Sequence, residues 1–295
     1  MKHNETTVLR KLTEDSAMQL LEGVTLPPQP GTLLEINRER AKAEPDVEAV
    51  ARIIERDLSV AAAVLKTINS PWFGLPKKVE SVRQAVLLLG MPNVVNVVIA
   101  LAMKSAIQGD NQAGIDRLFD EANDTALVLS SVMREVPIMS ADKAYLLGLF
   151  RDCGMPILLQ RYPKEYAEVL QEAAKHPERP LTDIEDARLK TDHAVVGALM
   201  SRHWHLPEEI GVIILNHHRT RELFGGAAWT LTPFEEGIRT VIAVLAMVDC
   251  ICHRLRKGKD SPEWAAIGEK VLAHLKMDQA EFEHLAWDQQ DRFAA

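Results

Sequence analysis

Apolar residues recur at the helical period along most of the chain. Residues 47–58 place an apolar face behind a start at Asp46, and residues 60–68 continue the pattern up to an Asn-Ser-Pro stop. Residues 81–90 begin with an N-capping serine and end with glycine, which predicts a short helix. Residues 91–107 predict a long apolar helix with a proline in its first turn. No stretch alternates apolar and polar residues over the length of a strand, so the pattern predicts an all-α protein.

A polar stretch at residues 108–116 separates these helices from a second series. Further helices are expected over residues 117–135, 141–160, 165–175, 184–189, 192–205, 207–218 and 238–257, followed by a C-terminal pair. Residues 220–237 look irregular, and could either cover a pocket or simply connect two helices.

We expect four parts in the chain, whose outer bounds at residues 26 and 256 rest on the family resemblance given below. We expect a helical N-terminal extension over residues 1–25 and a first helical lobe over residues 26–107. A second lobe takes residues 117–256, and C-terminal helices take residues 257–295.

Composition narrows the class of protein. Of the 295 residues 47% are apolar, 26% charged and only 5% aromatic, a balance that suits packed helices in a soluble protein. A net charge of −8 argues against a nucleic-acid or anionic-membrane surface. The N-terminus lacks the apolar core of a signal peptide, and the three cysteines lack zinc-site spacing. We therefore expect a cytoplasmic protein with no nucleic-acid and no membrane partner.

Several ionisable residues have apolar neighbours at helical spacing, which suggests that they face inward. They are Arg151 and Asp152 in "GLFRDCGMPILL", then His193, His217, His218 and Asp249. Carboxylates and imidazoles that converge from four helices could line a site for iron, manganese or another divalent ion.

Each of these residues also has a purely structural interpretation. His193 could meet capping groups at the start of its helix, and His217 with His218 could be a pair that the helix dipole favours at a C-terminus. Asp249 could simply pair with Arg151 or Arg254. The combination still calls for a shared explanation, because buried polar groups need partners.

Two blocks of sequence resemble a known family. "DLSVAAAVLKTINSPWFGLPKKVESVRQAVLLLG" at residues 57–90 resembles the N-terminal signature of HDOD domains, and "LPPQPGTLLEI" resembles their opening. "AYLLGLFRDCGMPILL" and "TDHAVVGALMSRHWHLPEEIGVIILNHHR" are similar to the segments in which HD-superfamily hydrolases carry metal ligands, and Asp249 takes the place of their final aspartate. The resemblance covers about residues 26–256, and it implies an HD-like helical bundle used in bacterial signal transduction.

The chain departs from the pattern of a working hydrolase in two places. Arg151 stands where the histidine of the His-Asp pair belongs, and residues 119–135 contain no histidine for the upstream ligand. Arginine cannot ligate a cation, so we expect no metal, no other cofactor and no catalysis. We expect the Arg151 guanidinium to bridge Asp152 or Asp249 instead.

If a metal did bind, the remaining donors would hold it. The expected ligands are then Asp152, His193, His218 and Asp249, with His217 as the alternative member of its pair.

The resemblance leaves two functions to compare. The first is a non-catalytic regulatory module that binds a signalling protein or a small signal, with a possible homo-oligomer. Its candidate interaction loop contains Asn69, Trp72, Phe73 and Gly74, although the aromatics could equally fill an interface between the lobes. The alternative is a metal-dependent phosphohydrolase or phosphodiesterase that acts on nucleotides or cyclic nucleotides.

Overall fold

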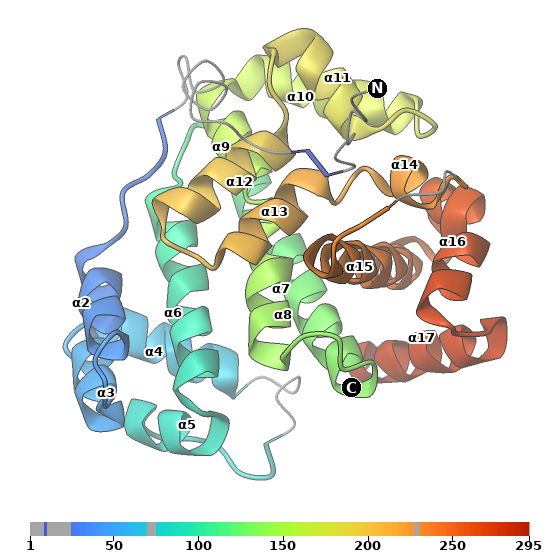
Figure 1. The fold of residues 1–295 in the computed structure, drawn as a ribbon. Helices are drawn as coiled ribbons and strands as arrows, with labels where there is room; N and C mark the ends of the chain where they lie inside the picture. Colours follow the sequence, from blue (N-terminus) through green and yellow to red (C-terminus); the bar gives the residue numbers. More distant parts are fainter. Residues whose placement is uncertain (1–8, 11–24, 70–74, 227–229, 295) are drawn as a thin grey trace, which may run out of the picture. The chain divides into compact units, whose positions relative to one another are not determined.

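The computed structural model describes residues 9–10, 25–69, 75–226 and 230–294 (Figure 1). Every regular element in these ranges is a helix, which confirms the predicted all-α class. Among the described residues, the chain divides into two compact units, one of residues 27–108 and one of residues 109–294 together with residues 9–10 and 25–26. None of the helices in the described ranges is long and apolar enough to cross a membrane.

The smaller unit contains five helices. They are α2 (Gly31–Arg40), α3 (Val47–Glu55), α4 (Leu58–Ile68), α5 (Val82–Leu89) and α6 (Met91–Ala106). Side chains that the helical period predicts to face inward, such as Val50, Ile54 and Ile68, are fully buried.

Helix caps set the boundaries in this unit. Asp46 accepts a hydrogen bond from the Glu48 amide at the start of α3, and Gly90 ends α5 with a φ of 81°. The prediction that Leu58 belongs to the first of these helices is wrong. Asp57 caps a new helix at that point, and Leu58 is 81% exposed.

The candidate interaction loop is described only at its start. Asn69 donates from Nδ2 to the Val79 carbonyl at 2.8 Å and accepts from the Val79 amide at 2.7 Å. Asn69 therefore closes the base of the loop, while Trp72, Phe73 and Gly74 lie outside the described residues.

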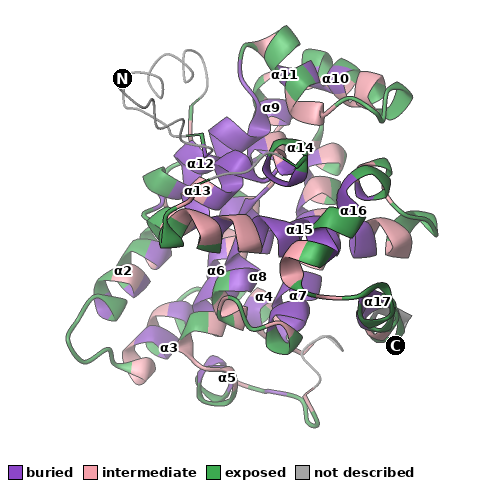
Figure 2. Cartoon of the chain, turned by 45° about the vertical axis from the view of Figure 1, so that its right-hand side comes forward, coloured by how far each residue is buried: buried purple, intermediate pink, exposed green. Residues whose placement is uncertain are grey.

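The larger unit contains the remaining described helices. They are α7 (Gln112–Glu135), α8 (Ala141–Phe150), α9 (Gly154–Arg161), α10 (Pro163–Lys175), α11 (Leu181–Leu189), α12 (His193–His203), α13 (Glu208–Asn216), α14 (Thr220–Phe224), α15 (Pro233–Lys257), α16 (Pro262–Leu275) and α17 (Gln279–Ala294). Figure 2 shows mostly buried residues on α12 and α13, whereas α10, α11 and α17 carry exposed faces.

Two predictions about this unit need correction. The segment 141–160 is two helices, α8 and α9, and the break falls on residues 151–153. Gly154 begins α9 at a close approach to α12, because a Cβ there would lie 2.1 Å from the backbone oxygen of His193. The segment 220–237 is also more regular than expected, since it holds α14 and the start of α15, which a capping box of Thr232 and Glu235 begins.

Candidate functional site

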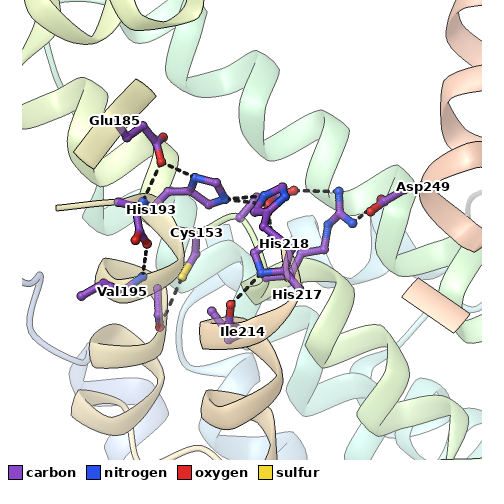
Figure 3. Close-up of polar contacts among 12 residues, drawn as sticks. Cys153, Glu185, His193, Val195, Ile214, His217, His218 and Asp249 are labelled. Atoms are coloured by element: carbon purple, nitrogen blue, oxygen red, sulfur yellow. Dashed lines mark hydrogen bonds and ion pairs between the residues drawn. The ribbon is translucent and has the colours of Figure 1, made fainter. Parts of the chain in front are cut away.

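The predicted site residues come together in the larger unit. Arg151 and Asp152 lie in the turn between α8 and α9, His193 opens α12, and Asp249 lies on α15. His217 and His218 follow the end of α13. Figure 3 shows the histidines between Glu185 on one side and Asp249 on the other.

Arg151 and Asp152 follow each other in the chain, yet both side chains reach the same pocket. In a continuous helix neighbouring side chains point about 100° apart. In the turn, Arg151 and Asp152 instead contact each other, with Nη2 of the arginine 2.9 Å from Oδ2 of the aspartate. Nη1 of Arg151 pairs with Oδ1 of Asp249. The guanidinium thus bridges both carboxylates, whereas the sequence left open which of the two it would engage.

Glu185 fixes the ring of His193. Both side chains are fully buried, and Nδ1 of His193 lies 2.7 Å from Oε2 of Glu185. The same carboxylate accepts from the His193 amide at 3.0 Å and from the Tyr166 hydroxyl at 2.5 Å. Since Nδ1 is engaged, His193 turns Nε2 toward Asp152 and His218.

His217 is oriented in a similar way by the backbone. Its Nδ1 lies 2.6 Å from the Ile214 carbonyl, to which it donates, so Nε2 faces Asp152 Oδ1 at 3.2 Å. The side chain is almost fully buried. An imidazole whose Nδ1 is bonded to a carbonyl or a carboxylate, with Nε2 free for the site, is the usual arrangement of a metal-ligating histidine.

One group of donor atoms has the spacing of a metal site. It comprises one ligand atom each from Asp152, His193, His217 and His218, all within 4.8 Å of one another. The set of four metal ligands expected from the sequence therefore changes in one residue. His217 joins the group and Asp249 does not, because Asp249 turns an oxygen toward Arg151.

The pocket has two halves, one with the guanidinium of Arg151 and one with the histidines. Asp152 lies between them, with Oδ2 on the guanidinium and Oδ1 on the histidines. Burial raises the pKa of Asp152, but Arg151 and then His217 outweigh it and hold this pKa well below its usual range. The carboxylate is consequently ionised and available to both halves.

The histidines differ in protonation. Burial lowers the pKa of His193, but the carboxylate of Glu185, helped by Asp152, raises it to about 9. Burial, followed by repulsion from His217 and His193, lowers the pKa of His218 well below its usual range. A charged His193 can therefore donate from Nε2 to a neutral His218, whose Nε2 is 2.9 Å away.

Sequence reasoning missed several residues that complete the pocket. Glu185 and Tyr166 lie on α11 and α10, where the apolar period draws attention to other positions. Glu263 at the start of α16 bonds to the Thr220 hydroxyl, and its pKa is raised by burial and, to a smaller extent, by Asp249. A glutamate eight residues before His193 offers no local signal, because only the tertiary fold brings the two together.

Comparison with known proteins gives the family. The sequence model of the HDOD domain matches residues 26–220, which is more than half of the chain. The chain belongs to the HDOD family. The resemblance drawn from the "NSPWFGLP" block is thereby confirmed.

Two relatives of this HDOD chain are themselves uncharacterized proteins. One, from Treponema pallidum (strain Nichols), is 25% identical over 198 residues, 65% of this chain and 37% of the relative. The other, YuxH from Bacillus subtilis (strain 168), is 37% identical over 70 residues, 24% of this chain and 17% of the relative. The HDOD chain thus spans well under half the length of both.

Solved structures share the fold at low sequence identity. One of them is a protein from Shewanella amazonensis SB2B that is named as a phosphohydrolase. It superposes with a TM-score of 0.71 at 19% sequence identity, and the match covers 93% of each chain. An HDOD domain protein with unknown function from Geobacter sulfurreducens gives 0.65 at 19% identity, covering 95% of this chain and 97% of its own. A protein from Marinobacter aquaeolei VT8, named as a signal transduction protein, gives 0.66 at 21% identity over 97% of this chain and 61% of its own.

Proposed function

We propose that this chain is a non-catalytic regulatory module that binds a signalling protein or a small signal in a bacterial cell. The observation that carries this proposal is the Arg151 guanidinium, which bridges Asp152 and Asp249 inside the pocket. Hydrolysis by HD-type proteins depends on a metal-activated water. A fixed positive charge that already engages both carboxylates competes with any cation on that side of the pocket.

The histidine half of the pocket fits one divalent ion. Asp152 would supply an oxygen and His193, His217 and His218 would supply nitrogens, a donor set that suits iron, manganese or zinc. The contact between His217 Nε2 and Asp152 supports this fit. Because Nδ1 already donates to Ile214, that contact is favourable only with a second proton on the ring or with a cation between the two groups.

This fit is the specific observation that favours the second candidate function, a metal-dependent phosphohydrolase or phosphodiesterase. A bound ion would supply a water of lowered pKa. The residues of this chain would supply the cradle, in which Glu185 and the Ile214 carbonyl orient the two imidazoles and Asp152 balances the charge.

Metal analysis combined with an activity assay separates the two functions. The protein is purified without chelator, loaded with Mn²⁺, Fe²⁺ or Zn²⁺ at about pH 8, where the ion has to displace the proton of His193, and analysed for metal content. It is then incubated with bis(p-nitrophenyl) phosphate and cyclic nucleotides. We expect at most one ion per chain and no hydrolysis above the metal-only blank.

Metal-dependent hydrolysis that disappears in Asp152→Asn would refute the regulatory proposal in favour of the enzyme. Asp260→Asn is the matched control, since Asp260 pairs with Arg254 away from the pocket. It should leave both metal content and any hydrolysis unchanged.

We place the partner contact of the module at the loop that Asn69 closes. A photo-crosslinking amino acid in place of Trp72 tests this in cells. A crosslink to a separate signalling protein supports the placement. A crosslink only to other residues of the same chain contradicts it and supports the alternative, in which the aromatics fill an interface between the two lobes.

A further inference from the structure

The dipeptide Leu9–Arg10 is bound to the larger unit through its backbone. The Arg10 amide donates to Oδ1 of Asn216 at 2.7 Å, and Nδ2 of Asn216 donates to the Arg10 carbonyl at 3.1 Å. Such a reciprocal pair of hydrogen bonds holds both the amide and the carbonyl of a single residue, as a hydrogen-bonded pair in a β-ladder does. Asn69 makes the same pair with Val79 to close a loop.

The side chains of the dipeptide are bound as well. Nη1 of Arg10 lies 3.0 Å from Oδ2 of Asp192, whose side chain is 6% exposed. The other oxygen of Asp192 caps α12 by accepting from the Val195 amide at 2.8 Å. Leu9 is 4% exposed, so the site takes an apolar side chain followed by an arginine.

A groove of about 820 Å³ continues from the dipeptide. Its apolar wall includes Ala198, Leu206, Val212, Leu215 and Phe234, and Phe234 is 53% exposed. Figure 1 shows the dipeptide as a short blue piece beside α13. The groove, the amide of Asn216 and the carboxylate of Asp192 together have the composition of a peptide-binding surface.

We propose that Asn216, Asp192 and this groove form a binding site for an extended peptide with an apolar residue followed by arginine, and that Leu9–Arg10 of the same chain occupies it. The described hydrogen bonds and the ion pair identify this occupant. The proposal of a peptide site does not depend on whether the histidine pocket binds a metal or catalyses hydrolysis.

The position of the site connects it to the histidines. Asn216 directly precedes His217, and Asp192 directly precedes His193. A peptide that binds the two residues therefore contacts both helix ends that present the imidazoles. Replacement of Leu9–Arg10 by a segment of a partner protein would therefore change the contacts at these two helix ends. The partner would not need to contact the histidines themselves.

The test uses the full chain and a fluorescein-labelled peptide with the sequence of residues 5–14. In the wild type the site is filled by Leu9–Arg10, so the labelled peptide should bind weakly. In a Leu9→Asp/Arg10→Asp double variant the site is open, and fluorescence anisotropy should show binding at least about tenfold tighter than in the wild type. Arg52→Ala, which removes an exposed ion pair to Asp46, is the control and should bind like the wild type.

A second comparison tests how the site recognises arginine. In the open variant, a peptide with alanine in place of Arg10 should bind about tenfold more weakly than the arginine peptide. Adding Asp192→Asn, which keeps the helix cap, should remove this preference. An open variant that binds no better than the wild type, or a preference for arginine that survives Asp192→Asn, overturns the proposal.

The oligomeric state distinguishes occupation within one chain from exchange between two copies. Sedimentation of the wild type and the double variant should give the same mass if the segment binds within its own chain. A wild-type dimer that the double variant converts to a monomer would show that the segment crosses to a second copy, and would refute the assignment within one chain.

Discussion

Replacing Arg151 by alanine tests whether the guanidinium holds the pocket together. Its side chain is 10% exposed, and it pairs with Asp152 at 22% exposure and Asp249 at 33% exposure. Removing one partner of a buried ion pair costs about 3–5 kcal/mol, because the remaining charge stays buried without compensation. Partial exposure of the two aspartates places this variant near the lower end, at about 3 kcal/mol.

Urea unfolding followed by tryptophan fluorescence measures this cost. Trp204 on the larger unit is fully buried and reports its unfolding. Arg254→Ala is the matched control, because Arg254 also bridges two carboxylates, those of Asp260 and Glu283. These two acids are 42% and 48% exposed, so we expect a cost of only about 1 kcal/mol from this bridge.

The pH dependence of the free energy of unfolding gives a second test of Arg151→Ala. Although burial raises the pKa of Asp152, Arg151 is the largest of the effects that hold it well below its usual range. A depressed carboxyl pKa contributes stability above the unfolded value of about 4, and this stability is lost as the pH falls through the folded value. The difference between wild type and Arg151→Ala should therefore shrink below about pH 4. A cost no larger than that of Arg254→Ala at neutral pH would refute the reasoning.

Three further predictions concern the supports of the pocket and the core around it. Glu185→Gln should destabilise the protein most below about pH 6.5, by up to roughly 3 kcal/mol. The raised pKa of His193, about 9, contributes stability that is present at low pH and is lost as the pH rises through that value. Gly154→Ala should cost more than about 3 kcal/mol, because the new methyl group would meet the His193 backbone. Gln289→Met should stabilise by about 1 kcal/mol, because the amide of Gln289 is fully buried and finds no hydrogen-bond partner among the described residues.

Each of these predictions has a control or a contradicting result. Urea titrations between about pH 6 and pH 10 measure the Glu185→Gln effect, and a difference that stays constant over this range would contradict it. Gly237→Ala is the control for Gly154→Ala, because Gly237 lies within α15 with open space around it and should gain up to about 1 kcal/mol. A lower melting temperature for Gln289→Met would show that the amide has partners that the methionine removes.

The sequence predicted some capped helix starts and missed others, among them the capping box of Thr232 and Glu235 at the start of α15. Asp46 and Ser81 begin helices where expected, and Asp57 would have placed a boundary correctly had it been given the same weight. The break at residues 151–153 was missed because the hydrophobic period continues across it. Just after the break, Gly154 approaches a backbone oxygen of α12 closely, a contact between segments about 40 residues apart that the local pattern does not show.

The sequence predicted which residues belong to the candidate site, but not which of their side chains contact one another. Arg151, Asp152 and the histidines stood out as ionisable residues at inward positions, which local spacing is able to show. The sequence could not predict that Asp152 separates the guanidinium from the histidines, because this depends on which oxygen of Asp152 faces which neighbour. Glu185 was missed for the same reason, since its carboxylate acts through a contact with another helix.

The sequence by itself determined the helical class and the family, and it identified Arg151 as a departure from the hydrolase pattern, because caps, periodicity and motifs are local properties of the chain. The tertiary structure alone decided that the guanidinium engages both aspartates, that His217 rather than Asp249 joins the possible ligands, and that Asn216 binds the backbone of Arg10. Apart from the pair of Arg151 with its neighbour Asp152, these pairings join residues that lie far apart in the chain, and the strength of all of them depends on burial and on distances of a few ångströms. Neither quantity exists until the helices pack.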